Sequence, residues 1–141
     1  MRRPEIAWRR QSMFKEKRIY MQTRHELAET ARRAARLIEQ RGLHKGDYID
    51  IGTGAVCLQG ALVLALGARD LRYNFLFTMQ HDNFRSIDRA CASLLRREGH
   101  DLKTYGDDGN YNLPSWNDRP EITAEDVVLL LKKEAEELET A

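Results

Sequence analysis

The sequence is poor in cysteine, in proline and in long apolar runs. Its 141 residues include two cysteines and three prolines, with 42% hydrophobic and 32% charged residues. The longest apolar run, residues 61–67, is far shorter than the roughly 20 residues that cross a bilayer. No apolar signal segment follows the amino terminus. These absences exclude a disulfide scaffold, a membrane protein and a wholly disordered chain, and we expect one cytoplasmic domain without membrane association.

The two cysteines, Cys57 and Cys91, each lie in an apolar pattern with helical spacing. A free buried thiol behaves there as a small hydrophobic group. A disulfide between them is the less favoured alternative, because intracellular disulfides are rare.

The net charge of +1 hides an uneven distribution along the chain. Residues 1–24 carry +6, residues 119–141 carry −4, and the middle carries −1. We divide the chain into a basic arm, residues 1–22, and a helical domain, residues 23–141. The basic side chains of the arm are Arg2, Arg3, Arg9, Arg10, Lys15, Lys17 and Arg18.

Three interpretations of the arm stay open. It binds a polyanion with release of counterions, it docks on the acidic carboxyl-terminal helix within the chain or across a dimer, or it is a solvated face. Five large apolar side chains of the arm argue against a purely solvated tail. They are Trp8, Phe14, Ile19, Tyr20 and Met21.

The spacing of apolar residues predicts four helices and a mostly α fold. A capping box at Thr23 and a stop at Gly42 bound the first. The second covers residues 55–66 and is apolar all round, which is typical of a core helix. The third covers residues 83–98 with Asp82 as its N-cap, and the fourth follows a capping box at Thr123. The late acids of the fourth oppose its dipole, so that end should fray or find a basic neighbour.

Two details of this helix pattern predict packing. Alanines on the first helix allow a neighbouring helix to approach closely. Gly60, inside the second helix, lowers helix propensity by roughly 1 kcal/mol, and close approach of another backbone is the usual compensation.

At most one small β-hairpin is expected beside the helices. Residues 48–51 and 71–77 are the candidate strands, the second with period-two alternation of apolar residues. Residues 105–120 are interpreted as a loop, because residues 106–110 have turn chemistry. We therefore expect a compact bundle of four main helices.

The run Asp50-Ile51-Gly52-Thr53-Gly54 resembles the first motif of Rossmann-like methyltransferases. Asp70 falls where the ribose-binding acid would be. The sequence offers too few strands for a doubly wound sheet, and Val56 replaces the third glycine. We interpret the run as a loop before a helix and expect no cofactor.

No metal site is expected. The four histidines have no helical i,i+4 pair, and neither cysteine has a partner two residues away. Asp107-Asp108-Gly109 lacks the ligand ladder of a calcium loop. Cys57 is flanked by apolar residues, so burial is expected rather than the exposed, electropositive setting of a nucleophile.

A candidate pocket consists of Cys57, Trp116, Asn117 and Asp118. Two interpretations apply. In the favoured structural one, Trp116 fills the core while Asn117 and Asp118 bond to nearby backbone amides. In the functional one, the two polar residues anchor a ligand beside Cys57.

Three blocks of sequence resemble a bacterial family of small uncharacterised proteins, a domain of unknown function, with actinobacterial members and expected phage members. The blocks are residues 57–62 (Cys-x-x-Gly-Ala-Leu), residues 116–118 (Trp-Asn-Asp) and residues 123–127 (Thr-x-x-Asp-Val). The resemblance covers roughly residues 25–139 and leaves out the arm. It implies a helical domain with Cys57, Gly60 and Trp116 in the core, and it carries over no catalytic residue.

The sequence therefore predicts a non-enzymatic intracellular binding protein, encoded by a phage or mobile element, whose basic arm engages a protein or nucleic acid. A homodimer is a candidate state. The alternative is a small ligand-binding protein or enzyme with a pocket near Cys57, Asn117 and Asp118.

Overall fold

The computed structural model describes residues 21–67, 78–79, 81–102, 104–105, 110–111 and 113–140, and its first helix is α2 (Arg24–Arg41). The helix begins at the predicted capping box. The Glu26 N–H donates to the Thr23 hydroxyl oxygen at 3.1 Å, and the Thr23 N–H donates to the Glu26 carboxylate at 2.8 Å. It ends at Gly42, whose φ of 93° favours glycine.

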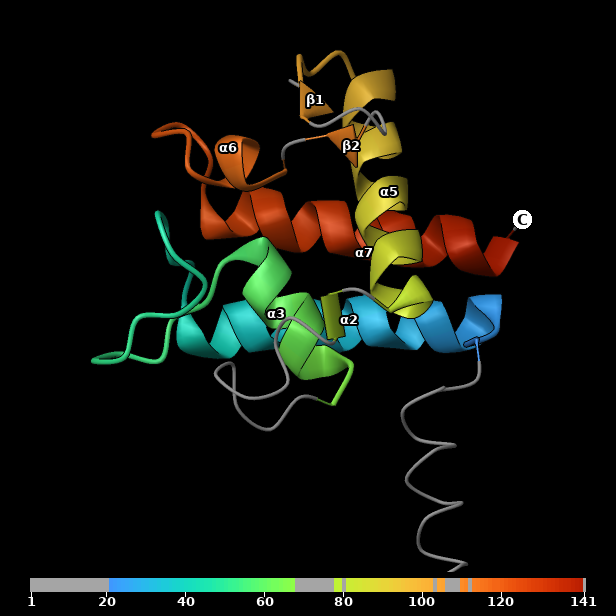
Figure 1. The fold of residues 1–141 in the computed structure, drawn as a ribbon, viewed down its shortest axis with the longest axis horizontal. Helices are drawn as coiled ribbons and strands as arrows, with labels where there is room; N and C mark the ends of the chain where they lie inside the picture. Colours follow the sequence, from blue (N-terminus) through green and yellow to red (C-terminus); the bar gives the residue numbers. More distant parts are fainter. Residues whose placement is uncertain are drawn as a thin grey trace, which may run out of the picture.

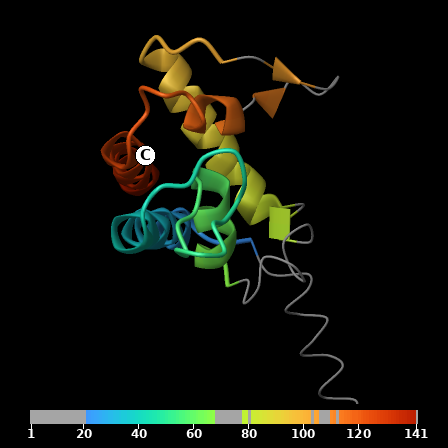
Figure 2. The same cartoon turned by 90° about the vertical axis from the view of Figure 1, so that its left-hand side faces the viewer.

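Helices α2 and α7 (Ala124–Thr140) lie side by side and run in opposite directions (Figures 1 and 2). The contact face of α2 carries four alanines that are wholly buried: Ala28, Ala31, Ala34 and Ala35. The close approach predicted from these alanines is confirmed. Helix α7 begins at the second capping box, where the Thr123 N–H donates to the Asp126 carboxylate at 2.8 Å.

The apolar helix α3 spans Leu58–Ala65, three residues shorter at its start than predicted. The backbone of Val56 bonds instead to the loop after α2, because its N–H donates to Gly42 O and its carbonyl accepts from His44 N–H. Cys57 is therefore the N-cap rather than a residue of the helix. As expected for a helix apolar all round, nearly every residue of α3 is buried.

Helix α5 (Asp82–Arg97) crosses α7 at a steep angle (Figure 1). Its N-cap is His81 and not the predicted Asp82, because the His81 Nδ1 accepts from the Asn83 N–H at 3.0 Å. An imidazole nitrogen therefore accepts the capping hydrogen bond that was predicted for a carboxylate. The predicted stop at Gly99 is confirmed by its φ of 93°.

The small hairpin lies elsewhere than predicted. It pairs β1 (Thr104–Tyr105) with β2 (Asn110–Tyr111) in antiparallel register, inside the segment interpreted as a loop. A short helix, α6 (Leu113–Asn117), follows it and was also missed. Elements of two to five residues leave no hydrophobic period to detect. Of the predicted strand over residues 48–51, one bridge from Ile49 to Val56 is present.

Among the described residues the predicted fold class is confirmed: they form a mostly α bundle of four main helices with one small hairpin. Three predictions lie outside the described residues, namely the arm up to residue 20, the strand over residues 71–77 and the turn over residues 106–109. The core forms where α2, α3, α5 and α7 meet, and Trp116 of α6 is its largest fully buried side chain.

Candidate functional site

Asn117, at the end of α6, joins three segments that are far apart in the sequence. Its side-chain oxygen accepts from the Leu58 N–H at 3.0 Å, where α3 begins. Its side-chain NH₂ donates to His44 O at 3.1 Å. Asn117 is 1% exposed and its bond with the Leu58 N–H is buried, so it satisfies a backbone group that would otherwise lack a partner. The amide therefore fixes α6 against α3 and against the loop after α2.

Asp118 and Lys45 also join the end of α6 to the loop after α2. The Asp118 carboxylate accepts from the Gly46 N–H at 2.9 Å. The Lys45 ammonium donates to three carbonyl oxygens around the end of α6: Asn117 O at 3.1 Å, Ile122 O at 2.7 Å and Arg119 O. Sequence reasoning missed Lys45, because one lysine after a helix carries no distinguishing pattern.

Cys57 uses its sulfur to cap α3. The Sγ accepts from the Gly60 N–H at 3.3 Å, and the side chain is buried. Burial raises the pKa of this thiol, and burial raises the pKa of Cys91 further. Because the thiolate is the reactive form, this setting does not activate Cys57 as a nucleophile. Both cysteines are free, which confirms the favoured prediction.

The structure brings together three of the four candidate pocket residues. Cys57, Asn117 and Asp118 line a cavity of about 170 Å³ with Tyr48. Ligand pockets usually measure roughly 300–1,000 Å³. Asn117 and Asp118 also bond to backbone, but to residues 59 to 73 positions away rather than to the nearby amides of the predicted turn.

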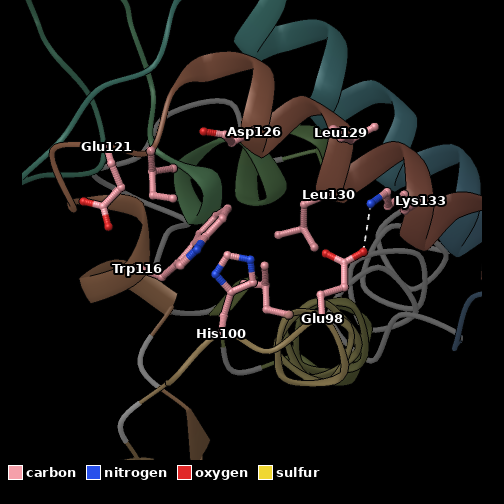
Figure 3. A pocket seen from close by; sticks show the side chains of 10 residues that line it. Glu98, His100, Trp116, Glu121, Asp126, Leu129, Leu130 and Lys133 are labelled. Carbon is pink, nitrogen blue, oxygen red and sulfur yellow. Dashed lines mark hydrogen bonds and ion pairs between the residues drawn. The ribbon is translucent and has the colours of Figure 1, made fainter.

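Trp116 lines a different hollow, of about 220 Å³, between α5, α6 and α7 (Figure 3). Its indole meets the His100 ring edge to face, with 6.1 Å between the ring centroids. Within the described part of the chain, the buried Trp116 Nε1 makes no hydrogen bond. An ion pair between Glu98 and Lys133, 2.8 Å long, lies across the hollow from Trp116.

The acidic end of α7 finds cations within the folded domain. The Arg24 side chain donates to Leu138 O at 3.0 Å. Arg32 forms a bidentate ion pair with the Glu139 carboxylate at 2.8 and 2.9 Å. Arg97 pairs with Glu137 at 2.8 Å. Of the two predicted outcomes, fraying or a basic neighbour such as the arm, the second is found, and among the described residues the neighbours come from α2 and α5.

One group of metal-ligating side chains occurs among the described residues. It consists of His25, Glu29 and Glu139, whose ligand atoms lie within 4.8 Å of one another. The Arg32 guanidinium contacts both carboxylates, each within 2.9 Å. A bound cation would have to displace that positive charge, which disfavours metal binding at this group.

Two carboxyl groups lie in poorly hydrated positions between the helices. Burial raises the pKa of Glu134, on α7, to about 7, and the nearby Glu137 charge adds to the effect. Burial also raises the pKa of Asp88, on α5, to about 6, although Gln59 donates a hydrogen bond to it at 3.1 Å. Neither residue lines the hollows around Cys57 or Trp116.

Residues 22–137 match a family of unknown function, DUF6197. The chain belongs to this family. No curated protein and no solved structure matches it. The match to DUF6197 begins at Gln22, which bonds to two helices of the domain. The Gln22 N–H donates to Asn83 Oδ1 on α5 at 2.8 Å, and the Gln22 side-chain oxygen accepts from the Thr30 hydroxyl on α2. Within the described ranges, no helix is long and apolar enough to cross a membrane.

Proposed function

We propose that this DUF6197 protein is a non-enzymatic binding protein of the cytoplasm whose basic arm engages a polyanionic partner, either a nucleic acid or an acidic protein. The observation that carries the proposal is the separation of charge. Residues 1–22 hold seven basic and two acidic side chains, while the rest of the chain has a net charge of −4. Each phosphate that an arginine or lysine neutralises releases counterions and so favours binding.

The internal ion pairs of the domain support this choice over docking of the arm on α7. Arg32 and Arg97 already pair with Glu139 and Glu137. Arg24 bonds to the last carbonyls of the same helix. Because the acidic end of α7 has these partners, an external polyanion is the better match for the arm.

The surroundings of Cys57, Asn117 and Asp118 support the non-enzymatic part of the proposal. The thiol is buried with a raised pKa, and the amide and carboxylate bond to backbone groups. Nucleophilic catalysis needs an activated nucleophile beside a base. This arrangement offers stability instead.

Fluorescence anisotropy titrations at several salt concentrations test the proposal. The three labelled probes are a 25-base-pair DNA duplex, a single strand of DNA and poly-glutamate. We expect the affinity for DNA to fall roughly 10²- to 10³-fold between 50 and 200 mM salt if four to six phosphates are neutralised. Binding to poly-glutamate alone would select the acidic-protein branch. The proposal would be rejected if none of the three probes binds, or if the affinity does not change with salt concentration.

Two variants with the same loss of charge localise the effect. The first changes Arg2, Arg3, Arg9 and Arg10 to glutamine. The second changes four exposed arginines of the domain to glutamine: Arg36, Arg41, Arg85 and Arg89. We expect the arm variant to lose binding and the domain variant to keep most of it. Equal losses would assign binding to net charge rather than to the arm.

The alternative function is ligand binding in the cavity beside Cys57, Asn117 and Asp118, and its support is the cavity of about 170 Å³ itself. Native mass spectrometry of the intact protein, purified without denaturant, tests it. A retained small molecule that is lost in Asn117→Leu would favour this alternative. The proposed phage or mobile-element origin is tested by the genes that neighbour the coding sequence.

A further inference from the structure

Leu129 interrupts the charged outer face of α7. Its side chain is 51% exposed, whereas the large apolar residues on the other faces of this helix are buried. The charged positions one turn away are Glu125, Asp126, Lys132 and Lys133. A single exposed leucine is common on protein surfaces, so the significance of Leu129 depends on the groove and the charges beside it.

Leu129 also forms the ridge between two hollows. Towards α2 lies a mainly apolar groove of about 500 Å³, lined by Ile38, Gly42, Ala124 and Val128 and bordered by Glu39, Glu125 and Lys132. On the other side lies the hollow of about 220 Å³ that Trp116 lines (Figure 3). This face therefore combines an exposed apolar side chain with a neighbouring groove that is mainly apolar.

The charges around Leu129 are self-complementary. Glu125 and Asp126 precede it by four and three residues, and Lys132 and Lys133 follow it by three and four. Glu125 and Lys132 lie on the α2 side of Leu129, whereas Asp126 and Lys133 lie on the side of the Trp116 hollow. If two copies of α7 cross in opposite directions at Leu129 about a two-fold axis, like sides face each other, so Glu125 of each copy lies opposite Lys132 of the other. Asp126 likewise lies opposite Lys133. A two-fold interface requires this property, because the same surface serves both partners.

Neither lysine is fully engaged within the chain. Lys133 pairs with Glu98 at 2.8 Å with 43% of its side chain exposed, and Lys132 lies 3.6 Å from Glu39 with 54% exposed. An ammonium group has three donors. Each lysine can therefore keep its present carboxylate and bind a second one. Glu125 makes no ion pair or hydrogen bond with any described residue.

We propose that the protein forms a two-fold homodimer in which α7 packs antiparallel against α7 of a second copy. Leu129 of each copy packs against Leu129 of the other, and the groove between α2 and α7 borders this contact on each copy. The flanking acids and lysines set the direction of pairing. One helix face per copy is at the small end of specific interfaces, so the dissociation constant should lie in the micromolar range.

Sedimentation velocity of the full chain from 5 to 500 µM tests the proposal with two matched variants. Leu129→Asp should raise the dissociation constant about 100-fold, because two leucines leave the interface of each dimer. Ile51→Asp is the control, since Ile51 is a 95% exposed aliphatic residue on a different loop. It should leave the constant within about twofold. Circular dichroism melts establish that both variants fold.

A mixing experiment tests the direction of pairing. Glu125→Lys alone places two positive charges opposite each other at each end of the contact, and Lys132→Glu alone places two negative charges there, so each homodimer should weaken. When the two variants are mixed, both contacts join opposite charges, and a heterodimer should form. The double variant E125K/K132E should pair with itself, which a parallel arrangement would forbid.

Several results would overturn the proposal. They are a monomer at 500 µM, equal weakening by Leu129→Asp and Ile51→Asp, or no recovery on mixing. Association that survives Leu129→Asp and falls steeply with salt would place the contact in the arm instead.

Discussion

Gly60→Ala tests whether the close approach at α3 governs stability. Two effects of opposite sign compete at this position. Alanine is about 1 kcal/mol better than glycine inside a helix, so propensity alone predicts a more stable protein. A Cβ at Gly60 would collide with the carbonyl oxygen of Tyr48, which belongs to rigid backbone rather than to a flexible side chain. The collision predicts a less stable protein.

The structure indicates which effect is larger. Inserting a methyl group into packed surroundings costs about 1–3 kcal/mol. The displaced Tyr48 carbonyl also accepts from the Cys57 N–H at 3.1 Å, and losing that bond costs about 1 kcal/mol. After the gain in propensity, we expect the free energy of unfolding to fall by about 2 kcal/mol. The melting temperature should fall by roughly 6–10 °C.

Urea denaturation followed by circular dichroism measures this difference. Gly52→Ala makes the same chemical change on an exposed turn, where the nearest atom to the new Cβ is the Asp50 carboxylate at an ordinary 3.4 Å. That variant should stay within about 0.5 kcal/mol of the parent. If Gly60→Ala is as stable as the parent or more stable, the backbone contact at Tyr48 is not tight, and the reasoning is refuted.

Three further predictions concern the buried polar groups. Because the folded pKa of Glu134 is raised to about 7, the native state holds the proton more tightly, so stability should fall by up to about 3 kcal/mol between pH 4.5 and 8. Glu134→Gln should flatten much of that slope in urea titrations, with exposed Glu136→Gln as the control; an unchanged slope would contradict the assignment. Lys45→Met should lower the free energy of unfolding by about 2–4 kcal/mol, since it leaves three carbonyl oxygens without their donor, whereas Lys132→Met should cost less than about 1 kcal/mol. Cys57 and Cys91 should resist a thiol reagent at pH 7.5 until urea unfolds the chain, and rapid labelling of the native protein would show that one of them is accessible.

The helices could be predicted from sequence because their signals are local. The capping boxes at Thr23 and Thr123 involve side chains three residues away from the groups they bond. The glycine stops at Gly42 and Gly99 depend on one backbone angle each. Gly60 was also informative, since a glycine inside an apolar helix predicts close approach, although its contact with Tyr48 was not foreseeable.

The junction around α6 could not be predicted, because its contacts join distant parts of the chain. Asn117 is 59 residues from Leu58, and Lys45 is 77 residues from Ile122. Such bonds leave no period in the sequence. The sequence singled out Asn117 and Asp118 by their motif and predicted a structural role. It gave no indication that Lys45 bonds to the end of α6. It also gave no indication that Trp116 lines a hollow separate from the cavity beside Cys57.

The two proposals are linked by a prediction that neither makes alone. The slope of log affinity against log salt counts the phosphates that a complex neutralises. A dimer joined through Leu129 presents two arms to one duplex, whereas a monomer presents one. At protein concentrations above the dimer dissociation constant, Leu129→Asp should therefore reduce the salt slope for a 25-base-pair duplex by about half, although Leu129 lies on α7 and outside the arm. Ile51→Asp should leave the slope unchanged. An unchanged slope in Leu129→Asp, with dimerisation lost, would mean that each arm binds independently and that pairing of α7 has no part in polyanion binding.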